Sequence, residues 1–353
     1  MKHVVLTNAS LTGFQYGMLR DFEDEIVRIT GASRIDAPTR RLPKFVQARI
    51  QHGTRLERLR PLILKEDHDL RADVLWVVMM GAESFTMDLF KGWDRHVGTK
   101  VLYLFDTMES QLVPTRRVST CTDWDVLITS FSGARGFLEE QTQRRWHAVA
   151  QGVKLDRFQP AAPERKVIDY VAYGRRLQGT HQALRKHCKA TGRHYDYTVA
   201  ATLQPQIDPR ESYSLYAWHL NHAIFNVSWP VELTNPDRVA TFSPITCRWF
   251  EAAASGNVVL GGAPKDPTFG DFFDDGFVIP LDPGLDEEAL GALWQSLWAQ
   301  RSRLLAQASE RRARLSARWT WEARVREILD LIEGRPRLAS CAGAEGPEAS
   351  AAG

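Results

Sequence analysis

One short segment combines residue types that could bind a charged ligand. Residues 243–262 read SPITCRWFEAAASGNVVLGG, which predicts a helix running into a buried strand. At about 100° per residue, Arg248, Glu251 and Ser255 fall in one polar stripe beside an apolar seam. The first turn of such a helix offers free N–H groups and the positive end of the helix dipole, which suits a pyrophosphate. A turn further on, the Glu251 carboxylate could accept hydrogen bonds from two vicinal hydroxyls, as in a ribose.

The alternative for Arg248 and Glu251 is a solvated ion pair three residues apart on a helix surface. Spacing alone favours that alternative. The small residues of the AAAS segment favour a ligand instead, because they let another molecule pack closely against the helix.

Two acidic residues of the first half follow predicted strands and could accept a proton. Asp106 comes directly after VLYLF, and Glu83 comes directly after VVMMGA. Ligands of doubly wound sheets lie at the carboxyl ends of the strands, where such a carboxylate could act as a general base. Asp106 is the first choice and Glu83 the second. A helix cap or a solvated loop carboxylate is the alternative for each.

The loop after the first predicted strand, NASLTGFQYG, contains Gly13, Tyr16 and Gly17. Its glycines would let the backbone approach a substrate, although a turn that needs a positive φ explains them equally well. The loop lacks the GxGxxG spacing, which counts against a dehydrogenase.

The scaffold that must position these residues is predicted by the hydrophobic pattern. Apolar runs without in/out alternation are separated by helical patterns, which predicts an α/β protein with parallel sheets covered on both faces, the doubly wound architecture. In the first half we expect strands at 3–7, 74–80, 101–105, 125–129 and 146–150, and helices at 18–30, 84–93 and 134–143.

The alternation lapses over 151–166, which contains Gly152, Pro160 and Pro163, and then restarts. We therefore predict one domain over residues 1–155 and a second over 156–318, followed by a closing helix within 319–335 and a disordered tail over 336–353. In the second domain we expect strands at 167–173, 195–200, 224–227, 258–260 and 276–280, and helices at 180–191, 212–223, 244–255 and 286–317.

Bulk properties narrow the function classes. The 353 residues are 44% apolar and 25% charged, with a formal net charge of +2, which fits a soluble globular protein and does not argue for nucleic acid. The four cysteines have no CxxC spacing, so neither a zinc site nor a disulfide framework is indicated, and a cytoplasmic location fits best. No apolar run is long enough to span a membrane, although the Arg-rich run 301–318 leaves a peripheral membrane contact open.

The segment RWFEAAASGNVVLGG resembles the Arg-x-Phe-Glu-Ala-x-Ala-x-Gly-x-x-Val-Leu motif of GT-B glycosyltransferases, nearest the family 1-like and spore-maturation-type branch. Other segments agree in order. QGVKLDRFQP resembles the interdomain linker, YVAYGRR the strand and Gly-Arg that open the second domain, FGDFFDDGFVIPLDP a later phosphate-side loop, and WTWEARVREIL the closing helix. These matches span residues 151–332, whereas the first half agrees in architecture alone.

The resemblance implies two Rossmann-like domains that face each other across a cleft, with the donor nucleotide-sugar on the second domain and the acceptor on the first. It also implies that the closing helix packs back on the first domain. It assigns Glu251 to the donor ribose and Arg175, of the Gly174-Arg175 pair, to the diphosphate, because a guanidinium group can engage two phosphate oxygens at once. Arg176 is a weaker phosphate candidate, for which a surface cation is the alternative.

Arg248, typical of the nearer branch, would take part of the diphosphate charge. Thr246, in a position usually held by glycine, and Ser255 complete the predicted donor-binding set. The sequence also departs from the retaining pattern, because Ser243 replaces its first Glu and RRLQGT lacks the usual Lys-Gly. Inversion or retention therefore does not carry over.

The sequence thus predicts a metal-independent glycosyltransferase without a cofactor. It would move a sugar from a nucleotide-diphosphate-sugar to a hydroxyl of a glycan, a lipid-linked glycan or a metabolite. A nucleotide-sugar epimerase or hydrolase of the same fold, and a non-catalytic nucleotide-sugar-binding module, remain as alternatives.

Overall fold

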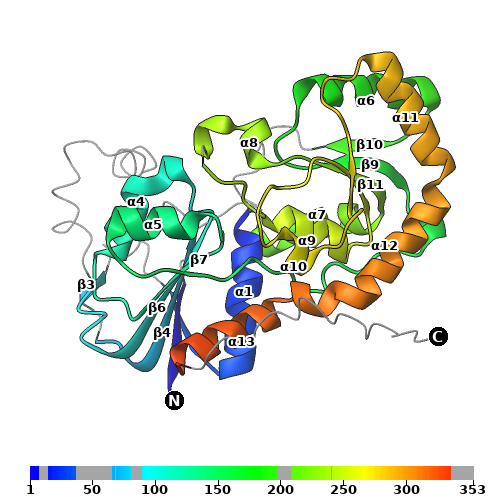
Figure 1. Cartoon of the computed structure of the whole chain (residues 1–353). Coiled ribbons are helices and arrows are strands. Elements are labelled where there is room, and N and C mark those ends of the chain that lie inside the picture. The colour runs from blue at the N-terminus through cyan, green and yellow to red at the C-terminus, as the bar shows by residue number, and fades with distance from the viewer. Residues whose placement is uncertain are drawn as a thin grey trace, which may run out of the picture.

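The computed structural model describes residues 1–7, 15–36, 66–67, 69–80, 90–197, 208–239 and 241–334. Within these residues the chain builds two parallel sheets, each covered by its own helices, in two lobes that lie side by side (Figure 1). Glu83, Gly13 and the predicted tail over 336–353 lie outside the described residues.

The first lobe contains a six-stranded sheet with the order β2-β1-β4-β6-β7-β8. Neighbouring strands are parallel throughout. The central strands are buried on both faces, which explains their continuous apolar sequences. The strands are β1 His3–Thr7, β2 Ser33–Asp36, β4 Arg71–Met80, β6 His96–Phe105, β7 Val126–Thr129 and β8 His147–Ala148, and a short parallel pair joins β3 Glu66–Asp67 to β5 Phe90–Lys91.

Helices cover this sheet on both faces. Helix α1 (Gln15–Thr30) buries Phe22 and Ile26 in one apolar core together with Trp76 and Tyr103 of the sheet. On the other face, α4 (Leu112–Ser119) and α5 (Ala134–Thr142) pack against those side chains of the same strands that point away from α1. Pro114 lies in the first turn of α4, where its missing N–H breaks no helical hydrogen bond.

The second lobe contains a five-stranded sheet with the order β10-β9-β11-β12-β13, again parallel throughout. Its strands are β9 Ile168–Ala172, β10 Tyr195–Tyr197, β11 Ala223–Ser228, β12 Val258–Gly261 and β13 Val278–Pro280. Its helices are α6 Gln178–Thr191, α7 Pro209–Asn221, α8 Val231–Thr234, α9 Cys247–Ala254, α10 Phe269–Phe272, α11 Glu287–Ala299 and α12 Arg301–Leu315.

The chain crosses between the lobes twice, and the two crossings are hydrogen bonded to each other. The Val153 N–H donates to the Trp319 carbonyl at 2.7 Å, and the Trp321 N–H donates to the Val153 carbonyl at 3.2 Å. Helix α13 (Trp321–Ile332) begins after the N-cap Thr320 and lies against α1 (Figure 1). Trp321 packs on Phe22 with ring centroids 4.7 Å apart. We call these two adjacent crossing segments, around Val153 and around 319–321, the hinge between the lobes.

Three expectations about elements need correction. Phe90–Lys91 form strand β5 instead of the end of a helix over 84–93. The helix expected over 286–317 is interrupted at Gln300, because a turn there lets Leu297, Leu304 and Leu305 enter the same apolar core. Strand β2 was not expected, since its sequence SRID has no apolar run and it lies at the sheet edge.

Candidate functional site

Asp106 is the first residue after β6, at the carboxyl edge of the first sheet. Its φ of +51° lies in the left-handed region, which Asp tolerates better than most residues. The Met108 N–H donates to the Asp106 carbonyl at 2.8 Å, and the Asp106 N–H donates to the Ser130 hydroxyl at 3.3 Å. The chain therefore turns sharply where the strand ends.

The Asp106 carboxylate meets a residue of the hinge. The Gln151 amide, which is fully buried, donates to Asp106 Oδ1 at 3.3 Å and to the Ser130 hydroxyl at 3.2 Å. Burial raises the pKa of Asp106 above its ordinary value, while Arg238, the Gln151 hydrogen bond, Arg248 and Arg175 oppose the rise. A carboxyl group with a raised pKa is a stronger base than an exposed one.

Three arginines of the second lobe lie near enough to this carboxylate to interact with its charge. Arg175 follows β9, Arg238 ends the short helix η5 (Pro236–Arg238), and Arg248 lies in the first turn of α9. All three are half-buried. Burial lowers the pKa of Arg175, and the positive charges of Arg238 and Arg248 lower it further, while Asp106 raises it. We call Arg175, Arg238 and Arg248 the arginine cluster. It carries more positive charge than Asp106 neutralises, which suits a ligand with two negative charges.

Gly174 makes room for this arginine cluster. Its φ of +79° is a conformation that side chains rarely adopt, and a Cβ atom here would lie 3.1 Å from Arg248 Nη2. The predicted Gly174-Arg175 pair and the predicted Arg248 thus meet in the folded chain.

The first turn of α9 adds polar groups to the same place. Thr246 is the N-cap residue, but its hydroxyl makes no capping hydrogen bond. That hydroxyl is buried and has no hydrogen-bond partner among the described residues. Ser255 lies at the opposite end of α9, fully buried, and donates to the Asn221 side-chain oxygen at 3.0 Å. Thr246 is therefore at the same end of α9 as Arg248, whereas Ser255 is at the other end.

Glu251 lies one turn into α9, enclosed between α9 and α7. It is 2% exposed. The Tyr213 hydroxyl donates to Oε1 at 2.5 Å, and the Tyr216 hydroxyl donates to Oε2 at 2.7 Å. Burial raises the pKa of Glu251, and hydrogen bonds from the two tyrosines and from Cys247, followed by the charge of Arg248, oppose the rise. Glu251 is therefore not a solvated partner of Arg248.

The remaining predicted residues lie in different surroundings. A Cβ atom on Gly17 would lie 2.2 Å from the Tyr213 Cβ, so α7 fills the space at Gly17. Tyr16 precedes it in the first turn of α1. Arg176 lies 5.1 Å above the Tyr197 ring and donates to the Ala172 carbonyl at 3.4 Å. Adjacent arginines thus have different environments, and Arg175 is the one that joins the arginine cluster.

Four residues of this site were not predicted from the sequence: Arg238, Gln151, Tyr213 and Tyr216. Arg238 lies in TNPDRVA, which matches no motif, and Gln151 begins the linker segment QGVKLDRFQP, whose resemblance assigns it no role. The tyrosines offer a weak signal, because their spacing of three places both on one face of the expected helix.

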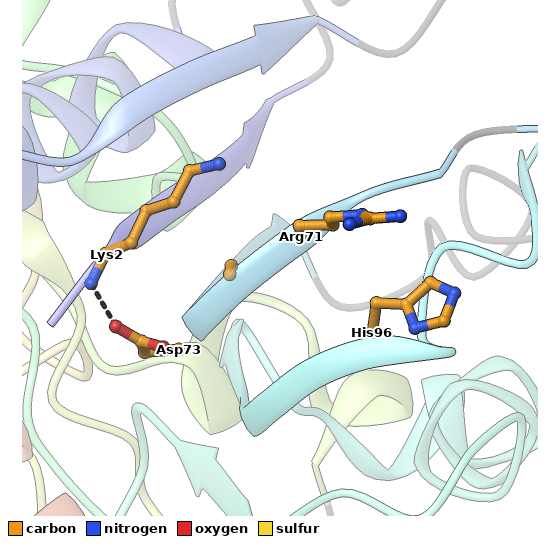
Figure 2. A pocket seen from close by; sticks show the side chains of 5 residues that line it. Lys2, Arg71, Asp73 and His96 are labelled. Carbon is orange, nitrogen blue, oxygen red and sulfur yellow. Dashed lines mark hydrogen bonds between the residues drawn. The ribbon is translucent and has the colours of Figure 1, made fainter.

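A separate hollow of about 470 Å³ lies at the amino edge of the first sheet, lined by Lys2, Arg71, Ala72, Asp73 and His96. Figure 2 shows Arg71 and Asp73 on β4, His96 at the start of β6, and Lys2 next to Asp73. The Lys2 N–H donates to Asp73 Oδ2 at 2.5 Å. Ligands of open α/β sheets bind at the opposite edge, so this hollow is not the site.

The described residues contain no group of three or more His, Cys, Asp or Glu side chains that could hold a metal ion. No helix in this part of the chain is long and apolar enough to cross a membrane.

Comparison with known proteins gives one family-model match and a set of similar solved structures. Residues 171–330 match the family model described as glycosyl transferase-like, which covers most of the second lobe and nearly all of α13. Among solved structures, the chain is similar to a glycosyltransferase from Rickettsia africae ESF-5, with a TM-score of 0.50 and 11% identity over 94% of this chain and 98% of that one. It is also similar to AviGT4, a glycosyltransferase involved in avilamycin A biosynthesis, with a TM-score of 0.47 and 12% identity over 95% and 99% of the two chains. No curated protein matches the sequence.

The predicted fold class is confirmed. The two parallel α/β sheets have the GT-B arrangement of two Rossmann-like domains. Residues 171–330, in the second lobe and α13, match a glycosyl transferase-like family model. The spore-maturation-type branch stays a prediction.

Proposed function

We propose that this GT-B chain transfers a sugar from a nucleotide-diphosphate-sugar to a hydroxyl group of an acceptor. The observation that carries the proposal is the arginine cluster, in which three guanidinium groups of the second lobe interact with one carboxylate of the other lobe and Gly174 lies against Arg248. A diphosphate is the group in such a donor that needs this charge.

In the proposed reaction, the bond between the anomeric carbon and the donor phosphate oxygen breaks, and the acceptor oxygen forms the new bond to that carbon. The arginine cluster and the first N–H groups of α9 stabilise the negative charge that grows on the leaving diphosphate. We propose that these cations suffice without a divalent metal or a cofactor.

Asp106 is the proposed base if the configuration inverts. A bound diphosphate would engage the guanidinium groups and add negative charge near Asp106, and both effects raise the pKa of its carboxyl group further. Asp106 would then accept the acceptor proton as the new bond forms.

The first test measures donor binding. A thermal-shift panel of UDP-, GDP-, dTDP- and CMP-sugars identifies the nucleotide, and titration then compares single variants. Arg175→Ala, Arg238→Ala and Arg248→Ala should each weaken binding by about tenfold or more, because each removes charge-assisted hydrogen bonds. Arg176→Ala should weaken it far less, since Arg176 stacks on Tyr197. Equal losses for Arg175 and Arg176 would contradict the assignment.

The second test measures turnover. Release of the nucleotide that increases with added acceptor, and that persists with EDTA, supports the proposal. Release or conversion that is independent of acceptor supports an epimerase or hydrolase, and no binding by any nucleotide-sugar overturns the proposal. Asp106→Asn should leave donor binding within a few fold and reduce turnover by about a hundredfold or more.

A further inference from the structure

Helix α7 supplies both hydrogen bonds to the buried Glu251, one to each oxygen. The distances are 2.5 Å from the Tyr213 hydroxyl and 2.7 Å from the Tyr216 hydroxyl. The two tyrosine rings stack with an angle of 19° between their planes. Both tyrosines are at most 8% exposed, so water does not compete for these contacts.

If Glu251 served only to connect α9 to α7 by hydrogen bonds, its side chain would not need a negative charge. Burying a carboxylate costs more than burying a neutral amide, which could also bond to both hydroxyl groups. An ionised carboxylate has about four acceptor positions, of which the two tyrosines and Cys247 use three. Glu251 also lies on the helix that carries Arg248 of the arginine cluster. The Glu251 carboxylate is therefore near enough to Arg248 to interact with its charge.

Tyr213 contacts both lobes. Its Cβ lies against Gly17 in the first turn of α1, where a glycine Cβ would be only 2.2 Å away. Arg157 lies over its ring at 5.4 Å and pairs with Asp21 of α1 at 2.6 Å. The residue that holds Glu251 Oε1 is thus packed directly against the first lobe.

We infer that Tyr213 and Tyr216 are positioning residues that orient the Glu251 carboxylate toward the donor ribose. Through its contact with Gly17, Tyr213 makes this orientation depend on how α1 docks on α7. The inference rests on the proposed function, because it assumes a nucleotide donor at this site.

The charged and titratable groups that face Glu251 are Tyr213 and Tyr216 of α7 and Cys247 and Arg248 of α9. Each tyrosine hydrogen bond favours the ionised carboxylate and lowers its pKa. Removing one hydroxyl therefore raises the pKa of Glu251. Nucleotide binding that needs the ionised form should then be lost at a higher pH during acidification.

The experiment uses the full chain and the nucleoside diphosphate that binds best in the panel, together with its 2′,3′-dideoxy form. Tyr213→Phe and Tyr216→Phe should bind the ribonucleotide about tenfold more weakly and discriminate less against the dideoxy form. The acid midpoint of binding should move to higher pH. The matched control is Tyr173→Phe, because the Tyr173 hydroxyl donates to Asp196 at 2.9 Å and its ring meets that of Tyr216 at 5.0 Å. This control should behave like wild type in all three measurements.

Two negative results are distinguishable. A wild-type chain that binds no nucleoside diphosphate contradicts the proposed function. A wild-type chain that binds one, with Tyr→Phe variants that match it in affinity, ribose discrimination and acid midpoint, contradicts this inference alone. If a Tyr→Phe variant fails to fold, Glu251→Gln replaces it, since the amide can bond to both hydroxyls. It should fold and lose ribose discrimination, and unchanged discrimination would again overturn the inference.

Discussion

At the scale of single residues, the burial of Glu251 changes the free energy of unfolding by an amount that depends on pH. Burial raises its pKa in the folded chain above the unfolded value. The contribution of Glu251 to stability is therefore fully present below the unfolded pKa and is lost as pH rises through the folded pKa. Glu251→Gln removes this dependence. We expect the melting temperature of the variant, relative to wild type, to increase between about pH 4 and pH 8.

An exposed glutamate gives a control of opposite sign. Hydrogen bonds from Arg326, followed by the charge of Arg28, lower the pKa of Glu322 on α13. Its stabilising contribution is present above the unfolded pKa and is lost on acidification. Glu322→Gln should therefore lose a little stability at neutral pH and nothing at low pH. If both variants shift in the same direction, the cause is not the environment of either carboxyl group.

The site residues that could be predicted from the sequence are those that belong to a pattern within a short segment. Arg248 and Glu251 share a helical stripe, and Gly174-Arg175 follows an apolar run at a strand end. Arg238 and Gln151 carry no such signal, because only the tertiary fold brings them to Asp106. Arg175 and Arg176 are adjacent and have identical side chains, so the sequence does not distinguish them. In the folded chain Arg176 stacks on Tyr197, and Arg175 does not. Burial of Glu251 likewise depends on α7, which is more than thirty residues away in the chain.

At the scale of elements, the contact between α1 and α7 depends on the missing side chain of Gly17. A methyl group there would lie 2.2 Å from the Tyr213 Cβ and 2.7 Å from the Pro209 carbonyl oxygen. Neither atom belongs to the end of a flexible side chain, so a helix must move. We expect Gly17→Ala to lower the free energy of unfolding by about 1–3 kcal/mol in denaturant titrations. It should also weaken nucleotide binding.

Gly136 on α5 provides the matched control. It is also a helical glycine, but no atom of the described chain lies within 4 Å of its ideal Cβ position. Gly136→Ala should raise the free energy of unfolding by about 0.5–1 kcal/mol, because alanine favours the helix. A Gly17→Ala variant as stable as Gly136→Ala would mean that α1 and α7 are not packed this closely.

Helices and strands could be predicted where their burial requires a recognisable run of apolar residues. Strands β1, β4 and β6 are covered on both faces and therefore read as continuous apolar runs. Strand β2 lies at the sheet edge and is polar, and the break at Gln300 has neither Gly nor Pro to mark it. In both cases the deciding contacts are long-range, and a local pattern does not contain them.

At the scale of the whole molecule, the lobes meet on both sides of the site. On one side are the hinge and the contact of α1 with α7. On the other, the Ser132 hydroxyl lies 2.6 Å and 2.7 Å from the two oxygens of Asp266. Phe242 packs against Phe131 and against Gly133, where a Cβ would lie 2.7 Å from the Phe242 Cβ. The two lobes are therefore held together at two separate places, in addition to the interaction of Asp106 with the arginine cluster.

The contact between Ser132 and Asp266 should set how often the lobes separate. Asp266 is 6% exposed, so a hydrogen bond to its carboxylate is worth about 1.5–3 kcal/mol. Removing it with Ser132→Ala should shift the ratio of closed to open forms by roughly tenfold or more toward the open form. The radius of gyration from small-angle X-ray scattering should increase, and bound nucleotide should reduce it again. Ser296→Ala is the control, because the Ser296 hydroxyl bonds only to Gln300 within the second lobe, at 3.2 Å, among the contacts of the described chain. An identical radius for wild type and both variants would show that the other interdomain contacts hold the lobes together without Ser132.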